Sequence, residues 1–229
     1  KDILRGQLRK LNRYTYAGAV NEFSAANIER AMDELDEPLI DGLVRTSEKI
    51  YDALLLGKSY PETVGGGKSL SFNLKYIDWD NWENNLVHVT EEFAVESQDK
   101  LHNARPDIVL FINGIPFAVI ECKAPHVSVD QAVEQNIRNQ QADYIPQLFK
   151  YVQIVLATNK NTVKYATTGT PKKFWNVWKE QDSTFIDSRL AQLVADRSTT
   201  EQDRNIVALF SKERIMELMR YFVLFDANV

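Results

Sequence analysis

The residues best suited to chemistry lie at the ends of two short apolar segments. Asp107 precedes one apolar run, and Glu121, Cys122 and Lys123 end the next. On a strand, Glu121 and Lys123 project from the same face because they are two residues apart, while Cys122 projects from the other face. Ionisable groups at the ends of buried strands are unfavourable unless they pair with one another or bind a cation.

Two carboxylates beside a lysine suit metal-assisted hydrolysis of a phosphodiester. Asp107, Glu121 and the backbone carbonyl of Cys122 offer oxygen ligands for Mg²⁺, which keeps its remaining waters and takes a phosphate oxygen. The metal acidifies a water for attack and stabilises the charge that develops on the phosphate. Lys123 can orient that water or neutralise the developing charge. The alternative is a partly buried ion cluster without catalysis, because short motifs occur by chance.

These residues need a β-hairpin to bring them together. Asn113-Gly114 is typical of a hairpin turn between strands at 107–112 and 116–123, and the wholly apolar run 117–120 predicts a central strand. A two-residue loop would place Asp107 and Glu121 on opposite faces of the sheet, whereas a shared metal needs them on one face. We therefore expect a three-residue loop, Asn113 to Ile115, or a bulge in the second strand.

A helix is expected directly after this hairpin. Ser128 and Gln131 have the spacing of a capping box, and apolar residues then recur every three or four positions as far as Leu148. Pro146 should end or kink this helix near residue 145. The pattern places Gln140 and Tyr144 four residues apart on one helix face.

The remaining periodicities predict an α/β domain with a mixed β core, one inserted helix and flanking helices. Spacings of three and four predict helices, and alternation or short apolar runs predict strands. The expected helices cover 3–11, 25–35, 42–56, 185–194 and 212–225, and the further expected strands cover 72–76, 86–95, 153–158 and 163–167.

Composition excludes several classes of protein. The chain has 229 residues, 44% of them hydrophobic, a net charge of −5 and a single cysteine. These values argue against intrinsic disorder, an internal disulfide framework and a multi-cysteine zinc site, and they fit the reducing cytoplasm. The longest apolar runs are too short to span a membrane. Residues 100–180 hold ten Lys and Arg against six Asp and Glu, a local basic segment that can meet phosphate.

Other candidate motifs are weaker. Gly65-Gly66-Gly67-Lys68-Ser69 imitates a phosphate-binding loop, but Glu62 stands where its first glycine belongs, so a turn is expected and ATP binding is not. Strand parity turns Cys122 away from Glu121, which predicts a packed thiol rather than a nucleophile. The histidines at 88, 102 and 126 have no ligand spacing, and Trp175 and Trp178 are expected in the core, with DNA stacking as the alternative.

Residues 103–125 strongly resemble the nuclease core of the restriction (R) subunit of type I restriction enzymes. The flanking segments at 77–93, 166–179 and 211–226 resemble the same family. The resemblance implies a restriction-endonuclease-like, PD-(D/E)xK fold in which Asp107, Glu121 and Lys123 are catalytic with Mg²⁺. It also implies a Gln-x-x-x-Tyr motif, matched here by Gln140 and Tyr144, that positions DNA or the catalytic residues.

The resemblance further implies a setting for this chain. In the family, the nuclease precedes ATP-driven motor domains and works on double-stranded DNA with modification and specificity subunits. ATP is thus expected for the full-length subunit and not for this fragment, which begins at Lys1 rather than Met. We expect a nuclease domain with N-terminal helical decoration at 1–195 and a helical connector at 196–229. A further helical Glu that the family carries near the site has no match here.

Two other functions remain open. A module of this fold could serve mainly as a docking platform for motor or methyltransferase subunits, although the intact Asp107, Glu121 and Lys123 favour catalysis. A stand-alone recombination or repair nuclease is the second alternative, and the C-terminal helix that resembles the family's approach to its motor argues against it.

Overall fold

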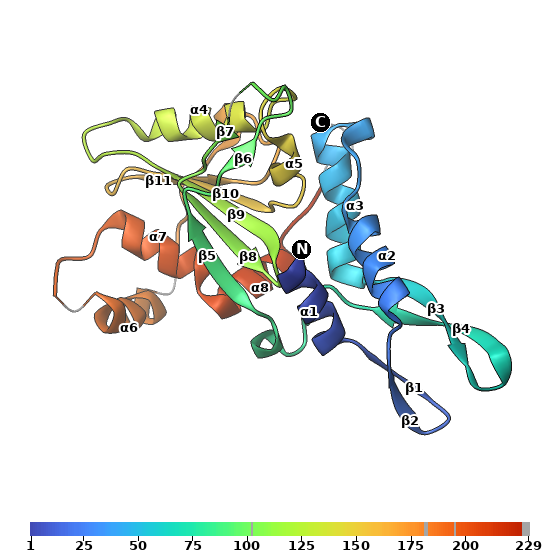
Figure 1. The fold of residues 1–229 in the computed structure, drawn as a ribbon. Helices are drawn as coiled ribbons and strands as arrows, with labels where there is room; N and C mark the ends of the chain where they lie inside the picture. Colours follow the sequence, from blue (N-terminus) through green and yellow to red (C-terminus); the bar gives the residue numbers. More distant parts are fainter. Residues whose placement is uncertain (102, 181–182, 195, 226–229) are drawn as a thin grey trace. The chain divides into compact units, whose positions relative to one another are not determined.

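The structure, a computed structural model, describes residues 1–101, 103–180, 183–194 and 196–225. The chain divides into two compact units (Figure 1). The first comprises Lys1–His88 with Phe111–Ile115, and the second comprises Val89–Leu110 with Pro116–Val229. The boundary predicted after residue 195 falls on a residue outside the described ranges and stays a prediction.

The first unit is built from helices and β-hairpins. Its helices are α1 (Asp2–Leu11), α2 (Ala25–Leu35) and α3 (Leu43–Leu56), which confirms the three N-terminal helices that periodicity predicted. Its hairpins are β1 (Arg13–Tyr16) with β2 (Ala19–Glu22), and β3 (Lys58–Val64) with β4 (Lys68–Leu74). Single 3-10 turns occur at Leu39–Asp41, Gly65–Gly67 and Trp82–Asn84.

Strand β3 runs through Pro61, which has no backbone N–H to donate to a strand ladder. Among the described residues β3 pairs with β4 and with no other strand, so the missing N–H of Pro61 can face away from the ladder. The next residue, Glu62, is buried and accepts hydrogen bonds from the Ser24 N–H at 2.8 Å and the Asn27 side chain at 2.7 Å. The hairpin thereby holds the first turn of α2, and the triple glycine forms its tip, as the sequence predicted.

The main sheet has five strands among the described residues, in the order β11-β10-β9-β8-β5. β10 is parallel to β9 and antiparallel to β11. The run 117–120 lies in β9 with at most 3% of each side chain exposed, which confirms it as a central strand. The sheet strands are β5 (Val87–Glu91), β8 (Ile108–Ile112), β9 (Ile115–Cys122), β10 (Ile154–Thr158) and β11 (Val163–Ala166). A separate short pair is formed by β6 (Val95–Glu96) and β7 (Asn103–Ala104).

Helices lie on both sides of this sheet in the second unit, with α4 on one side and α7 and α8 on the other (Figure 1). Because α4 connects the parallel strands β9 and β10, the three elements form a β-α-β crossover. α7 was not predicted, and a capping box of Thr200 and Asp203 begins it. The helices are α4 (Val129–Asn139), α5 (Pro146–Phe149), α6 (Ser183–Leu193), α7 (Glu201–Phe210) and α8 (Lys212–Tyr221), with a 3-10 turn at Lys172–Phe174. Within the described ranges, no helix has the length and apolar character that crossing a membrane requires.

Candidate active site

Glu121 lies near the end of β9, between β8 and β10, and its side chain is 0% exposed. In the parallel register of β9 and β10, Glu121 pairs with Ala157 and Cys122 pairs with Thr158. Lys123 follows β9 directly, and its backbone N–H donates to the Thr158 carbonyl at 2.7 Å. The carboxyl ends of two parallel strands therefore meet beside Glu121 and Lys123, and this is the edge at which α/β sheets bind ligands.

Asp107 lies immediately before β8 and reaches across to the end of β9. Its Oδ2 accepts a hydrogen bond from the Cys122 backbone N–H at 2.7 Å, while its carbonyl accepts one from the Glu92 N–H at 2.9 Å. The Asp107 carboxylate also lies close enough to Glu121 for its charge to raise the pKa of Glu121. The structure thus brings together the two carboxylates that the sequence singled out.

The hairpin between β8 and β9 differs from the one we expected. Its loop is the two residues Asn113-Gly114, with φ of 54° and 83°, so the predicted three-residue loop is wrong. Positive φ at both positions is the signature of a type I′ turn. The parity argument failed because it treated Asp107 as part of the ladder. Asp107 precedes β8, so strand alternation does not set the direction of its side chain. A bulge in β9, the other expected arrangement, stays a prediction.

The electrostatics of Glu121 are set by burial and by Asp107. Burial raises the pKa of the Glu121 carboxyl to about 8, and the negative charge of Asp107 adds to the effect, while the Lys123 cation opposes it. A buried pair of carboxylates is unfavourable when both are ionised, and a bound cation relieves that repulsion.

Helix α4 presents two amide side chains to Glu121. Gln135 Nε2 donates to Glu121 Oε2 at 2.7 Å, and Asn139 Nδ2 donates to Glu121 Oε1 at 3.3 Å. Gln135 Oε1 in turn accepts from Lys123 Nζ at 2.5 Å. Sequence reasoning missed both amides. Their spacing of four residues and their place on the helix that follows Glu121 were the signals that could have found them.

Gln140 and Tyr144 do not share one face of a helix, contrary to the expectation from periodicity, and their predicted role in positioning DNA or the catalytic residues stays a prediction. The helix ends at Asn139, so Gln140 and Tyr144 are not one turn apart on a continuous helix. Gln140 is buried; its Oε1 accepts from the Gly169 N–H at 2.7 Å and its Nε2 donates to the Asn136 carbonyl at 3.1 Å. The Tyr144 ring lies under the Arg138 guanidinium, 5.3 Å from it. These contacts tie the end of α4 to neighbouring loops.

The Cys122 thiol is half-buried and poorly suited to nucleophilic chemistry. Burial raises its pKa to about 11, and the charges of Asp107 and Glu121 contribute in the same direction. A thiol with such a pKa is neutral at pH 7, and the expectation that Cys122 is not a nucleophile stays a prediction. Of the three histidines, His102 lies outside the described residues, while His88 stacks on Phe111 with ring centroids 4.8 Å apart.

The donor set fits a divalent cation that prefers oxygen ligands. The Asp107 and Glu121 carboxylates are in contact, and Asn139 Oδ1 is a buried acceptor with no hydrogen-bond partner among the described residues. Nowhere in those ranges do three or more His, Cys, Asp or Glu side chains cluster as a metal site. A pair of carboxylates is nevertheless sufficient for Mg²⁺, which usually takes one or two from the protein and completes its shell with waters and phosphate.

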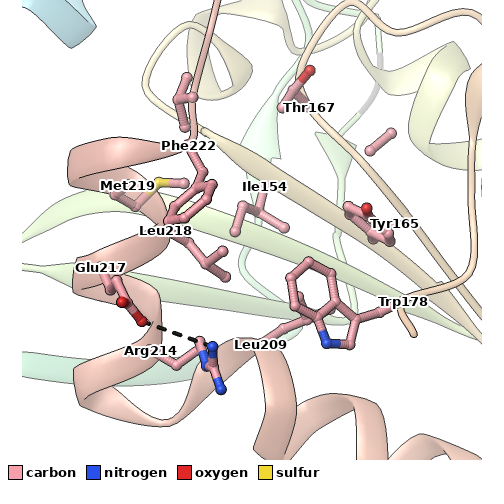
Figure 2. Close-up of a pocket in the computed structure, with 12 residues that line it drawn as sticks. Ile154, Tyr165, Thr167, Trp178, Leu209, Arg214, Glu217, Leu218, Met219 and Phe222 are labelled. Carbon is pink, nitrogen blue, oxygen red and sulfur yellow. Dashed lines mark ion pairs between the residues drawn. The ribbon is translucent and has the colours of Figure 1, made fainter. Parts of the chain in front are cut away.

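A separate apolar pocket of about 320 Å³ lies between the β10–β11 face and helices α7 and α8 (Figure 2). Ile154, Leu218 and Phe222 point into it, and Trp178 packs edge-on against Tyr165 with ring centroids 5.6 Å apart. The catalytic candidates are not among its lining residues. Trp178 therefore has the packing role that was expected, as does Trp175, which is buried.

Comparisons with known proteins agree with the resemblance drawn from residues 103–125. The family model described as type I restriction enzyme R protein N terminus (HSDR_N) matches residues 1–174. The chain is 28% identical to the type I restriction enzyme MjaIXP endonuclease subunit of Methanocaldococcus jannaschii, over 90% of this chain. It is 26% identical to the HindI endonuclease subunit of Haemophilus influenzae and 24% identical to the EcoprrI endonuclease subunit of Escherichia coli, each over 98% of this chain.

The relatives are longer proteins. The chain covers 20% of the length of the Methanocaldococcus and Haemophilus subunits and 65% of the Escherichia sequence.

Proposed function

Because this chain belongs to the family of type I restriction enzyme R protein N termini, we propose that it is the nuclease part of such a subunit and hydrolyses phosphodiester bonds of double-stranded DNA with Mg²⁺. The observation that carries the proposal is the buried Glu121 carboxylate, held in contact with Asp107 and beside Lys123 at the end of β9. We assign the PD-(D/E)xK roles to these three residues.

The proposed metal site uses oxygen atoms of Asp107 and Glu121 together with the Cys122 backbone carbonyl. Bound there, Mg²⁺ supplies an acidified water and stabilises negative charge on the phosphate. The chain's own residues supply orientation. The Cys122 N–H fixes Asp107, and the amides of Gln135 and Asn139 fix Glu121. Such outer contacts set ligand direction and metal affinity.

Lys123 supplies the positive charge at the site. Its Nζ is held at 2.5 Å by Gln135 Oε1, the same side chain that binds Glu121. An ammonium fixed beside two carboxylates can orient the attacking water or neutralise charge on the leaving oxygen. We propose that Gln135 and Asn139, rather than the predicted Gln140 and Tyr144, position the Glu121 carboxylate through their side-chain amides.

The proposed partners follow from the family. The full-length subunit is proposed to carry ATP-driven motor domains and to work with modification and specificity subunits, in the cytoplasm. Neither ATP nor sequence recognition is assigned to the residues described here.

The proposal is tested in the complete restriction complex with Asp107→Ala and Lys123→Ala. Each substitution should lower the DNA cleavage rate by at least about 10²-fold while ATP hydrolysis stays at the wild-type rate, because the ATP site belongs to the motor. Asp143→Ala and Lys179→Ala are matched controls, since both residues are exposed in the same unit. Wild-type cleavage by either site variant would remove that residue from the mechanism.

A further inference from the structure

Lys160 lies in the turn between β10 and β11 with a backbone conformation that disfavours lysine. Its φ is 77°, in the left-handed region that glycine adopts with little strain. Asn159 shapes the turn, because its Oδ1 accepts hydrogen bonds from the N–H groups of Asn161 at 3.3 Å and Thr162 at 2.9 Å. A lysine held in this conformation is a reason to ask what its side chain does.

The fold uses only the backbone of Lys160. Its carbonyl accepts a hydrogen bond from the Gln202 N–H at 3.2 Å, one of the first-turn donors of α7 that have no partner within the helix. Glycine at this position would make the same contact with less strain. The Lys160 side chain is exposed, and within the described residues no hydrogen bond or ion pair holds its amino group.

The turn is bound to the loop that leaves the candidate active site. Asn159 Nδ2 donates to the Val127 carbonyl at 2.7 Å, and Asn161 Nδ2 donates to the Pro125 carbonyl at 3.4 Å. Thr158 pairs with Cys122 in parallel register, and adjacent strands lie about 4.8 Å apart. Lys160 therefore lies at the same edge of the sheet as Lys123. Lys123 follows the end of β9, and Lys160 follows the end of its parallel neighbour β10.

We infer that Lys160 binds a backbone phosphate of the DNA strand that is cut at Asp107 and Glu121, within a few nucleotides of the scissile bond. This inference rests on the proposed function. Each DNA strand carries one phosphate per about 3.4 Å of helix axis, so a strand whose phosphodiester lies at Glu121 presents further phosphates along this edge.

Other lysines on this side of the sheet are less available for phosphate. Lys164 Nζ pairs with Asp130 at 2.7 Å and Lys172 Nζ pairs with Glu134 at 2.6 Å. A lysine that is paired with a carboxylate must break that ion pair before it binds a phosphate. Lys160 has no such ion pair with any described residue, so it can bind phosphate without that cost.

The test compares Lys160→Gly with Lys100→Gly. Lys100 is also an exposed lysine with positive φ, 59°, and it lies in the β6–β7 loop, well away from the β10–β11 turn (Figure 1). Both substitutions remove one positive charge and relax one left-handed residue, so both should raise the melting temperature of the chain by about 1–3 °C. Only Lys160→Gly should slow single-turnover DNA cleavage by the complete complex, by about threefold to tenfold at 150 mM salt. It should also make the slope of log rate against log salt concentration shallower by about one unit, the contribution of one phosphate contact. Lys160→Arg should retain the wild-type rate.

Equal cleavage rates and salt slopes for Lys160→Gly and the wild type would overturn the assignment. Equal losses for Lys160→Gly and Lys100→Gly would also overturn it, because net charge rather than position would then be responsible. Cleavage that survives Asp107→Ala would overturn the proposed function, and the assignment of Lys160 with it. Cleavage that requires Asp107 but ignores Lys160 would overturn the assignment alone.

Discussion

Gln135 donates its side-chain N–H to Glu121 Oε2 at 2.7 Å. The other atom of the same amide, Oε1, accepts from Lys123 Nζ at 2.5 Å, so one side chain of α4 fixes both charged groups at the end of β9. Asn139, one turn further along, donates to the second oxygen of the Glu121 carboxylate at 3.3 Å. The direction of the proposed metal ligand is thus set by two uncharged amide side chains of α4.

Gln135→Ala should lower DNA cleavage by the complete enzyme by about 10–100-fold, the range found when contacts behind a metal ligand are removed. Gln135 is only half-buried, so the melting temperature of the chain should change by no more than about 2 °C. Cleavage is measured at saturating Mg²⁺ and as a function of Mg²⁺ concentration, and the variant should require more metal for half-maximal rate.

Gln140→Ala is the matched control. Gln140 is buried and bonds to Gly169 and to the Asn136 carbonyl, so its removal should destabilise the chain by about 1–3 kcal/mol. Well below the melting temperature, its cleavage rate and Mg²⁺ dependence should match the wild type. A Gln140→Ala variant that is stable but inactive would favour the original interpretation of the Gln-x-x-x-Tyr motif.

The structure brings together the charged groups that the sequence singled out, whereas the amides that contact them were not predicted. The grouping of Asp107, Glu121 and Lys123 could be predicted because ionisable groups at the ends of apolar strands are unusual, and their catalytic role stays a prediction. The choice between Gln135 with Asn139 and Gln140 with Tyr144 could not be predicted, because both pairs have a spacing of four and the apolar periodicity continues past residue 139. The helix end at Asn139 is set by contacts such as the Ile145 N–H to the Asn139 carbonyl, 3.1 Å, which local sequence does not encode.

The fold shows the same division between local and non-local information. Strong local patterns predicted α1, α2, α3 and β9. Hairpin β1–β2 was missed, although Ala17 and Gly18 form its turn with positive φ, because its strands are only four residues long and largely exposed. β3 was missed because Pro61 disfavours a central strand. Pro61 is tolerated there because β3 has β4 as its one strand partner in the part of the chain that the structure describes.

Glu121→Gln should abolish cleavage and yet stabilise the metal-free chain at pH 7. The substitution removes a carboxyl that is unfavourable when ionised in this buried position next to Asp107. It also introduces an N–H, which Asn139 Oδ1, a buried acceptor without a partner among the described residues, can accept once the Asn139 side-chain amide turns over, because Asn139 Nδ2 faces Glu121 in the structure. We expect a gain on the order of 1–3 kcal/mol in the free energy of unfolding, measured with urea in the presence of a chelator.

The pH dependence of that gain has a defined sign. Folding raises the pKa of Glu121 from its ordinary value of 4.5 to about 8, so the stability of the wild type is reduced above pH 4.5, and increasingly so up to pH 8. Below pH 4.5 the carboxyl is neutral in both the folded and unfolded states, so the part of the stability difference between Glu121→Gln and the wild type that comes from ionisation should vanish. A Glu121→Gln chain that is less stable than the wild type at pH 7 would contradict this account.

Asp203 should stabilise the start of α7 through its charge. Its carboxylate accepts from both terminal nitrogens of Arg197, at 2.7 and 2.8 Å, and from the Thr200 N–H at 2.9 Å. These contacts hold the pKa of Asp203 well below its usual range. Asp203→Ala should therefore cost about 1–2 kcal/mol at pH 7, measured by urea unfolding.

The acid dependence of this contribution follows from the lowered pKa. The stabilisation is complete above about pH 4, the unfolded pKa of an aspartate, and is lost as pH falls toward the folded value. The stability difference between the wild type and Asp203→Ala should thus shrink below pH 4. Ser188→Ala in α6 is a control with an exposed side chain and should change stability by less than about 0.5 kcal/mol. If the stability difference between the wild type and Asp203→Ala were the same at pH 7 and pH 3, the charge of Asp203 would not be the source of its stabilisation.

The isolated chain should bind double-stranded DNA weakly and cut it poorly. Its net charge is −5, and the lysines at 164 and 172 in its basic segment are already paired with carboxylates. The remaining basic residues of that segment are offset by the acidic body of the chain, so we expect only a handful of phosphate contacts, and binding through a few such contacts weakens steeply with salt. In fluorescence anisotropy with a short duplex, we expect a Kd weaker than about 10⁻⁶ M at 150 mM salt, and a slope of log K against log salt that corresponds to only a few contacts. The chain would then depend on the motor and specificity subunits to bring DNA to Glu121. Tight, salt-resistant binding or rapid cutting by the chain alone would instead identify a stand-alone nuclease, because such an enzyme must hold its substrate without help.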